Sequence, residues 1–431
     1  MSVRDLRTKL TEPYWVIPAV CVVGAGGLAA LLIEVDKRLE RERLTVAFTG
    51  GPESARSLLG AIAASMLTLT ALVFSITVVV LQLASTQFSP RVLRTFLQDR
   101  QNQLSLGVFA ATFVYALVAL RAVRGQDGLV DRFVPGITIA VAFGLVLVSV
   151  ALFIAYIHRI TQSIRVSNII DRISTETESA IDRVSAQRGT RVRRDRPAGV
   201  AQPQVIRAAR RGVLIDLDES ALVAMACDAG GWIDVPHRIG TFSPSGATIA
   251  CVHAPREVDE AAAQDAFSLS VERSMDHDPA FGFRQLVDIA ERALSPGIND
   301  PSTAVQCLDQ LHHLLRVTAA ADLPTGVVED RDGEVRLVVA TRRWEDYLSL
   351  SLDEIRVWGG RSLQVHHRLR ALLHDLLADV GPSRRDDVLG QLALLDATAT
   401  AELPAAERQH LARQDIRARN KSPLRSGTDD H

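Results

Sequence analysis

Histidine is the residue type whose chemistry is most readily tested by spacing, because it binds metals and transfers protons. His312 and His313 are adjacent, as are His366 and His367, so each pair points to two different helix faces. His367 and His374 lie seven residues apart on one face, but the sequence offers no third ligand beside them. The four cysteines form no CxxC or Cys/His pattern. We therefore expect no metal site and no cofactor.

Catalytic signatures are also missing from the sequence. It contains no GxSxG, Walker A or HExxH motif, and no GxGxxG that follows a strand. The formal charge is −2 for 431 residues, so bulk electrostatic attraction to nucleic acid is excluded. We expect a protein that is not an enzyme and has no nucleic-acid partner.

A pattern with chemical meaning lies within and just beyond an apolar stretch, residues 58–83. Polar side chains recur there at intervals of three, seven, seven and four, and they are Ser65, Thr68, Ser75, Gln82 and Thr86. These intervals place them on one stripe of a helix that supercoils with a partner. Two interpretations stay open: hydrogen-bonded packing between membrane helices, or the wall of a water-lined pathway.

A second candidate is a corner between two predicted helices. It is formed by Ser295, Pro296, Gly297, Asn299, Asp300 and Pro301. Asp is a favoured N-cap and Pro a favoured first helical residue, so a new helix should start at this point. The exposed N–H groups of its first turn could bind an anion, although the Asp300 carboxylate would already satisfy them. We interpret the corner as structural, with anion binding as the alternative.

Four apolar stretches must position the polar stripe. They cover residues 14–33, 58–83, 104–120 and 134–157, and charged residues are absent from the interior of each. About 20 helical residues span a hydrocarbon core of about 30 Å, and only closed helices satisfy the backbone in lipid. The rest of the chain contains no comparable stretch. The predicted fold class is therefore a polytopic α-helical membrane domain (four transmembrane helices) followed by a soluble α+β domain.

The chain divides into five predicted parts: a transmembrane domain (1–157), a stalk helix and linker (158–203), a small strand-rich module (204–255), a mostly helical soluble domain with a hairpin (256–410), and a disordered tail (411–431). Between the second and third spans, a Ser-Pro pair starts a short amphipathic helix. Its Arg91 and Arg94 are candidate contacts to phospholipid headgroups, so the lipid bilayer is the first expected partner.

The positive-inside rule does not decide which side of the membrane holds the two termini, because Lys and Arg are almost equally numerous on the two sides of the spans. The basic run at residues 188–196 and the expected lack of disulfides in the C-terminal domain favour a cytoplasmic C-terminus. We expect a multi-pass membrane protein whose C-terminal domain lies in the cytoplasm.

Three segments together resemble one bacterial family of predicted membrane proteins, labelled domain of unknown function 2254. They are residues 82–91 (QLASTQFSPR), 284–290 (RQLVDIA) and 293–301 (ALSPGINDP), and residues 353–356 (DEIR) are similar too. Residues 272–278 depart from the family pattern, which has Glu-Arg-Thr followed after two residues by Gln-Asp. The resemblance spans nearly the whole chain and implies a bacterial inner-membrane protein, without an activity or catalytic residues.

Two functional hypotheses follow. The first is an oligomeric channel- or transport-like protein with a cytoplasmic regulatory domain, in which the second span lines a pathway. The alternative is a membrane-anchored sensor or scaffold that binds a ligand or protein through its soluble domain. Both accommodate self-association, because four short-looped spans leave surface for another copy to bury. The sequence does not identify a small-molecule or protein ligand.

Overall fold

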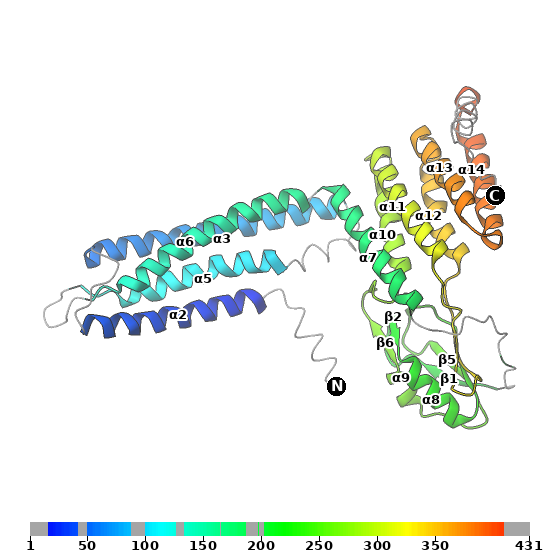
Figure 1. Cartoon of the computed structure of the whole chain (residues 1–431), viewed down its shortest axis with the longest axis horizontal. Coiled ribbons are helices and arrows are strands. Elements are labelled where there is room, and N and C mark those ends of the chain that lie inside the picture. Colours follow the sequence, from blue (N-terminus) through cyan, green and yellow to red (C-terminus); the bar gives the residue numbers. More distant parts are fainter. Residues whose placement is uncertain are drawn as a thin grey trace, which may run out of the picture. The chain divides into compact units, whose positions relative to one another are not determined.

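The computed structural model describes residues 16–41, 50–87, 100–125, 133–163, 165–186, 197 and 202–408. The chain forms two compact units, Met1–Arg165 and Val166–His431 (Figure 1). Each is described by itself.

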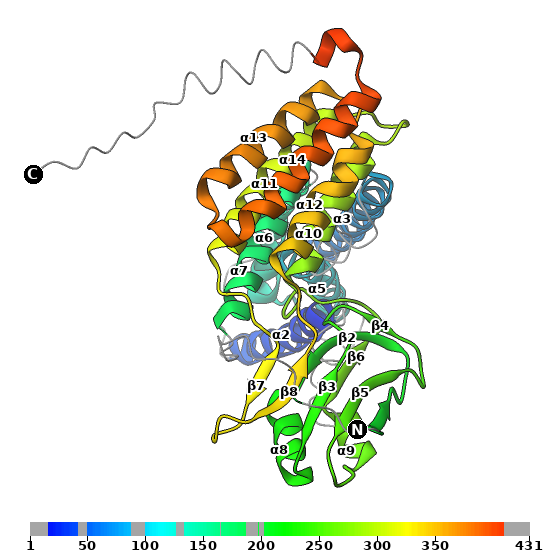
Figure 2. The same cartoon turned by 90° about the vertical axis from the view of Figure 1, so that its right-hand side faces the viewer.

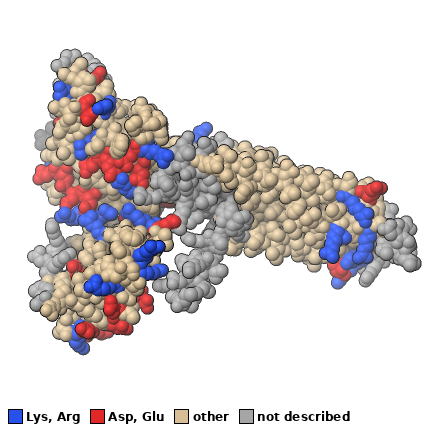
Figure 3. Space-filling model, turned by 180° about the vertical axis from the view of Figure 1, so that it is seen from behind, with Lys and Arg blue, Asp and Glu red and all other residues tan. Residues whose placement is uncertain are grey.

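The first unit contains four helices long and apolar enough to cross a membrane: α2 (Val16–Arg41), α3 (Pro52–Gln87), α5 (Arg100–Ala122) and α6 (Gly136–Ser163). They coincide with the four apolar stretches, so the predicted membrane domain is confirmed. Figure 3 shows a surface free of Lys, Arg, Asp and Glu along most of this unit, with charged residues gathered at one end.

Helix α5 is the centre of this unit. Over half of its apolar window (56%) is buried, against 17% to 22% in the other three helices. It packs against α2, α3 and α6. Gly107 permits the close approach of α2, because a Cβ at this position would lie 3.1 Å from both Cys21 Sγ and Pro18 Cα. The third span is therefore the helix around which the other three pack.

The second unit begins with α7 (Val166–Ala186), and five further long helices of this unit pack side by side (Figure 2). These are α10 (Pro279–Leu294), α11 (Pro301–Ala320), α12 (Trp344–Trp358), α13 (Leu363–Asp379) and α14 (Pro382–Glu402). α7 packs against α10 and α11. The predicted soluble α+β domain is confirmed by these helices together with two sheets.

The larger sheet has five strands in the order β1-β5-β3-β8-β7, and the smaller has three in the order β4-β2-β6. Their bounds are β1 (Gln204–Arg207), β2 (Gly212–Leu217), β3 (Trp232–Val235), β4 (Phe242–Ser243), β5 (Thr248–His253), β6 (Phe267–Ser270), β7 (Val327–Glu329) and β8 (Val335–Val339). The hairpin β7–β8 joins the larger sheet because β8 pairs in parallel with β3, with Ile233 opposite Leu337.

Two short helices close the sheet module: α8 (Glu219–Ala229) and α9 (Glu260–Asp265). Each starts at an aspartate, Asp218 or Asp259, whose carboxylate accepts a backbone N–H of the first turn. The apolar faces of the strands and helices share one core, which includes Leu222, Ile233 and Leu337.

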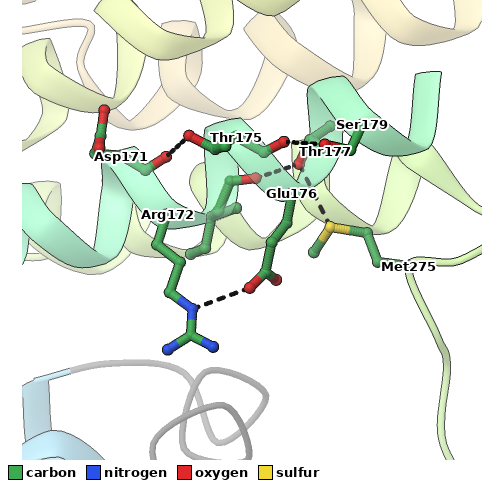
Figure 4. A network of polar contacts seen from close by, with 8 residues as sticks. Asp171, Arg172, Thr175, Glu176, Thr177, Ser179 and Met275 are labelled. Carbon is green, nitrogen blue, oxygen red and sulfur yellow. Dashed lines mark hydrogen bonds and ion pairs between the residues drawn. The ribbon is translucent and has the colours of Figure 1, made fainter. Parts of the chain in front are cut away.

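The contact between α7 and α10 is unusually close. A Cβ on Gly282 of α10 would lie 1.8 Å from Thr177 Oγ1 of α7, so only glycine fits at this position. The Thr177 hydroxyl donates to Ile173 O at 2.6 Å and contacts Met275 Sδ at 3.6 Å (Figure 4). On the exposed side of α7, Arg172 pairs with Glu176 at 2.9 Å. The stalk helix is thus an integral layer of the second unit.

Candidate functional site

The polar stripe of the second span lies on the outer face of α3. Ser65, Thr68, Ser75 and Gln82 are all exposed in the single chain, and the Thr68 hydroxyl donates to Ala64 O at 3.0 Å. Thr86 lies in the last turn of α3, and its side chain is outside the described residues. The structure therefore places four of the predicted residues together, facing away from the other three helices of the chain.

The opposite face of α3 explains this orientation. Large apolar side chains such as Leu59, Ile62, Met66 and Val73 point inward and are at most 6% exposed. They pack in the clusters that α3 forms with α5 and α6. Because this face of α3 is buried against the chain's own helices, the polar stripe is left outside, where Leu72 and Phe74 are exposed as well.

Small residues accompany the polar ones on this outer face. Ala61, Ala64 and Ala71 are exposed, and each lies four residues before Ser65, Thr68 or Ser75. Small residues spaced by four let two membrane helices approach closely. The face therefore has the composition of a helix–helix contact surface, although none of the described helices covers it.

Polar side chains inside the membrane unit find partners within the chain. Thr77 Oγ1 lies 2.7 Å from the Tyr156 hydroxyl, which joins α3 to α6. Thr112 Oγ1 lies 3.1 Å from Ser149 Oγ, which joins α5 to α6. These groups follow the rule that a buried polar group is hydrogen-bonded. The outward stripe on α3 is different because the chain itself does not enclose it.

Asp36, near the end of α2, has a role that the sequence analysis missed. Its side chain is 7% exposed and accepts hydrogen bonds from Ile137 N at 3.0 Å and from Thr138 N and Oγ1 at 2.9 and 2.7 Å. Both N–H groups belong to the first turn of α6, where helix geometry provides no acceptor. Asp36 therefore caps a helix about 100 residues later in the chain, which no local pattern reveals.

The Ser295–Pro301 corner joins α10 to α11. Asp300 is the N-cap of α11, and its carboxylate accepts Ser302 N at 3.1 Å and Thr303 N at 3.2 Å. Asn299 has φ +50° and donates its N–H to Ser295 O at 2.9 Å. The hydrogen bonds from Thr303 and Ser302 hold the pKa of Asp300 below its usual value. The donors that would attract an anion are thus taken by the chain's own carboxylate.

Pro296 and Gly297 complete the turn between these helices, and Pro301 occupies the first turn of α11. A Cβ on Gly297 would meet nothing within 4 Å, so this glycine shapes no cradle for a ligand. The corner consequently supports the structural interpretation. Arg91 and Arg94, the candidate headgroup contacts, lie outside the described residues.

Two of the family-like segments meet at one arginine. Arg284 in α10 contacts Asp288 (Nε–Oδ1 2.8 Å), Glu291 (Nη2–Oε2 3.4 Å) and Glu354 of α12. Burial and the neighbouring Glu354 carboxylate raise the pKa of Glu291, while the Glu354 hydrogen bond raises that of Arg284. One cation therefore holds three carboxylates on two helices. Among the described residues, no three His, Cys, Asp or Glu side chains are placed to hold a metal ion.

Comparison with known families supplies the identity of the chain. A family model described as "Predicted membrane protein (DUF2254)" matches residues 11–375. The chain belongs to this family. The resemblance seen in its motifs is confirmed, and the family description agrees with the four apolar helices.

Relatives in two mycobacteria show the same relationship. Uncharacterized proteins of Mycobacterium bovis and Mycobacterium tuberculosis are 34% identical to this member of the family over 410 residues. The match covers 90% of this chain and 76% of each relative, so it includes both units. No solved structure matches the chain.

Proposed function

We propose that this family member is an oligomeric channel- or transport-like protein of the bacterial inner membrane. The observation that carries the proposal is the outward polar stripe on α3. In the proposed assembly, the stripes of neighbouring copies face one another around a shared axis.

The energetics of lipid support this arrangement. A hydroxyl or amide group transferred to an apolar medium without a partner loses hydrogen bonds to water, at a cost of about 2–7 kcal/mol. The Ser75 hydroxyl and the Gln82 amide are exposed on a helix that is otherwise apolar enough to span the membrane. A second copy or an enclosed file of water supplies the missing partners, whereas lipid chains do not.

The soluble unit has the regulatory role in this proposal, and no catalytic step is assigned to it. α7 starts at Val166, three residues after α6 ends at Ser163, so a displacement of α7 pulls directly on the last span. We place this unit in the cytoplasm. The described cysteines are all free, as is usual in a reducing compartment.

The proposal is tested by ion conductance of the purified protein in planar bilayers bathed in potassium chloride. Ser75→Leu and Gln82→Leu are expected to lower the conductance about tenfold or more, because each removes a polar group from the path, and a loss of about 1.4 kcal/mol suffices for that factor. Phe74→Leu is the matched control, because Phe74 is 55% exposed on α3 but lies off the stripe.

Conductance that is unchanged in Ser75→Leu and Gln82→Leu would exclude α3 as the wall of a pathway. The stripe would then be a packing surface between copies only.

A further inference from the structure

The polar stripe of α3 continues to the first turns of the helix. Ser54 and Ser57 are exposed, and they lie eleven residues before Ser65 and Thr68. Eleven residues make about three helical turns, so each of these serines falls on the same side of α3 as the stripe residue that follows it. The surface that the proposed function assigns to the wall of a pathway therefore reaches the start of α3 at Pro52.

A carboxylate stands at this end of the stripe. Glu53 lies in the first turn of α3 and is exposed. It precedes Ser57 by four residues, a spacing that places two side chains next to each other on a helix. Residues 57–87 contain no charged side chain, so Glu53 carries the negative charge of this surface. In an assembly built around the stripe, one Glu53 from each copy would stand at the mouth of the pathway.

Basic side chains also occur at this end of the membrane unit (Figure 3), but they belong to its other sides. Arg56 Nη2 donates to Val123 O at 3.2 Å, which turns this guanidinium toward the end of α5. Lys37 and Arg38 lie on α2. Since the stripe faces away from α2 and α5, an axis in front of the stripe lies nearer to Glu53 than to these cations.

The stripe beyond Glu53 offers oxygen atoms that can accept. The Thr68 hydroxyl donates its proton to Ala64 O at 3.0 Å, so only its acceptor lone pairs remain for a species in front of the helix. Neutral oxygens can replace the water around a monovalent cation, whereas Ca²⁺ and Mg²⁺ are bound largely through carboxylates. The described part of the stripe has no carboxylate beyond Glu53.

We propose that the pathway formed by the α3 stripes conducts small monovalent cations and excludes anions, and that Glu53 determines this selectivity at its mouth. The inference rests on the proposed function, because a ring of Glu53 carboxylates exists only when several copies place their stripes around one axis. Such a ring concentrates cations at the entrance and repels anions. The Thr68 oxygens then coordinate the cation farther along the wall.

The test uses the full chain in planar bilayers of uncharged phosphatidylcholine, with a gradient of potassium chloride across the membrane. The voltage at which the current is zero gives the ratio of K⁺ to Cl⁻ permeability. The wild type is expected to favour K⁺ by about tenfold or more, and Glu53→Gln to reduce this ratio by about fivefold, because the variant keeps the shape of the side chain but removes its charge. A second gradient, of calcium chloride, should carry little Ca²⁺ current.

Glu34→Gln is the matched control. It removes the same charge from the same end of the membrane unit, but Glu34 lies on α2, where it pairs with Lys37 at 3.3 Å. Its permeability ratio should equal that of the wild type. Glu53→Asp keeps the charge and should keep the selectivity, whereas Glu53→Lys should shift the preference toward Cl⁻. A current in each variant shows that the protein still folds and assembles.

The possible results separate this inference from the proposed function. No current in the wild type would contradict the proposed function, and the inference would fall with it. A current that Cl⁻ carries as well as K⁺, or a permeability ratio that is the same in Glu53→Gln and the wild type, would overturn the inference alone. An equal loss of selectivity in Glu34→Gln, or Ca²⁺ current as large as that of K⁺, would overturn it as well.

Discussion

Replacing Gly282 with valine is expected to lower the stability of the soluble unit by about 3 kcal/mol or more, one of the two largest effects of a single substitution in this protein. Even the first added carbon would lie 1.8 Å from Thr177 Oγ1, so α7 and α10 must move apart. Overpacking a well-filled contact costs about 1–3 kcal/mol, and here the obstruction is a hydroxyl held by its own hydrogen bond to Ile173 O.

The measurement is thermal unfolding of the full chain followed by tryptophan fluorescence, because Trp232, Trp344 and Trp358 all lie in the soluble unit. Gly390→Ala is the control, since a Cβ at Gly390 of α14 meets nothing within 4 Å, and it should leave Tm unchanged or raise it. Thr177→Gly should recover part of the loss when combined with Gly282→Val. A valine variant as stable as the wild type would show that α7 does not pack against α10 in this way.

Replacing Arg284 with methionine is expected to cost about 2–4 kcal/mol. The change leaves the carboxylates of Asp288, Glu291 and Glu354 together without their shared cation, and breaking a buried pair costs about 3–5 kcal/mol. We reduce that figure because the Arg284 and Glu354 side chains are 24% and 43% exposed, so water screens part of the interaction.

The loss should depend on pH. The pKa of Glu291 is already raised in the folded protein, so the folded state binds a proton more readily than the unfolded state does. The contribution of Glu291 to stability therefore falls as the pH rises through the pKa of its carboxyl group. Removing the cation raises the pKa of the carboxylates further. The Tm difference between Arg284→Met and wild type should therefore be larger at pH 8 than at pH 5.

An exposed ion pair provides the comparison for this variant. Arg172→Met removes a cation that is 56% exposed and pairs with Glu176 on the surface of α7, and it should change stability by less than about 0.5 kcal/mol. Equal losses in the two variants, or a loss in Arg284→Met that is the same at both pH values, would mean that Arg284 does not organise α10 and α12.

The features that could be predicted from the sequence depend on residues that lie close together along the chain. The four spans follow from runs of apolar residues, and the start of α11 follows from Asp300 and Pro301. The outward position of the polar stripe could not be predicted in the same way. It depends on which face of α3 packs against α5 and α6, and in lipid the core and the outer surface are equally apolar.

The features that the sequence did not reveal are contacts between distant residues. Asp36 and Thr138 are joined across 102 positions, and the pairing of Ile233 with Leu337 joins strands that are far apart in the chain. A cavity beside Arg342 has walls from α7, α10, α12 and the β7–β8 hairpin. Local patterns predict the strands and helices that carry these residues, but not which of them the fold brings together.

Disulfide cross-linking in native membranes tests the central claim, that the polar face of α3 meets the same face of another copy. Cysteine is introduced at Ser75, on the stripe, or at Phe74, which is also exposed but off the stripe, in a chain whose own four cysteines are replaced by alanine. The account predicts oxidative cross-linking of two copies through Ser75→Cys and little through Phe74→Cys. Cross-linking through Phe74→Cys alone, or through neither, would contradict it.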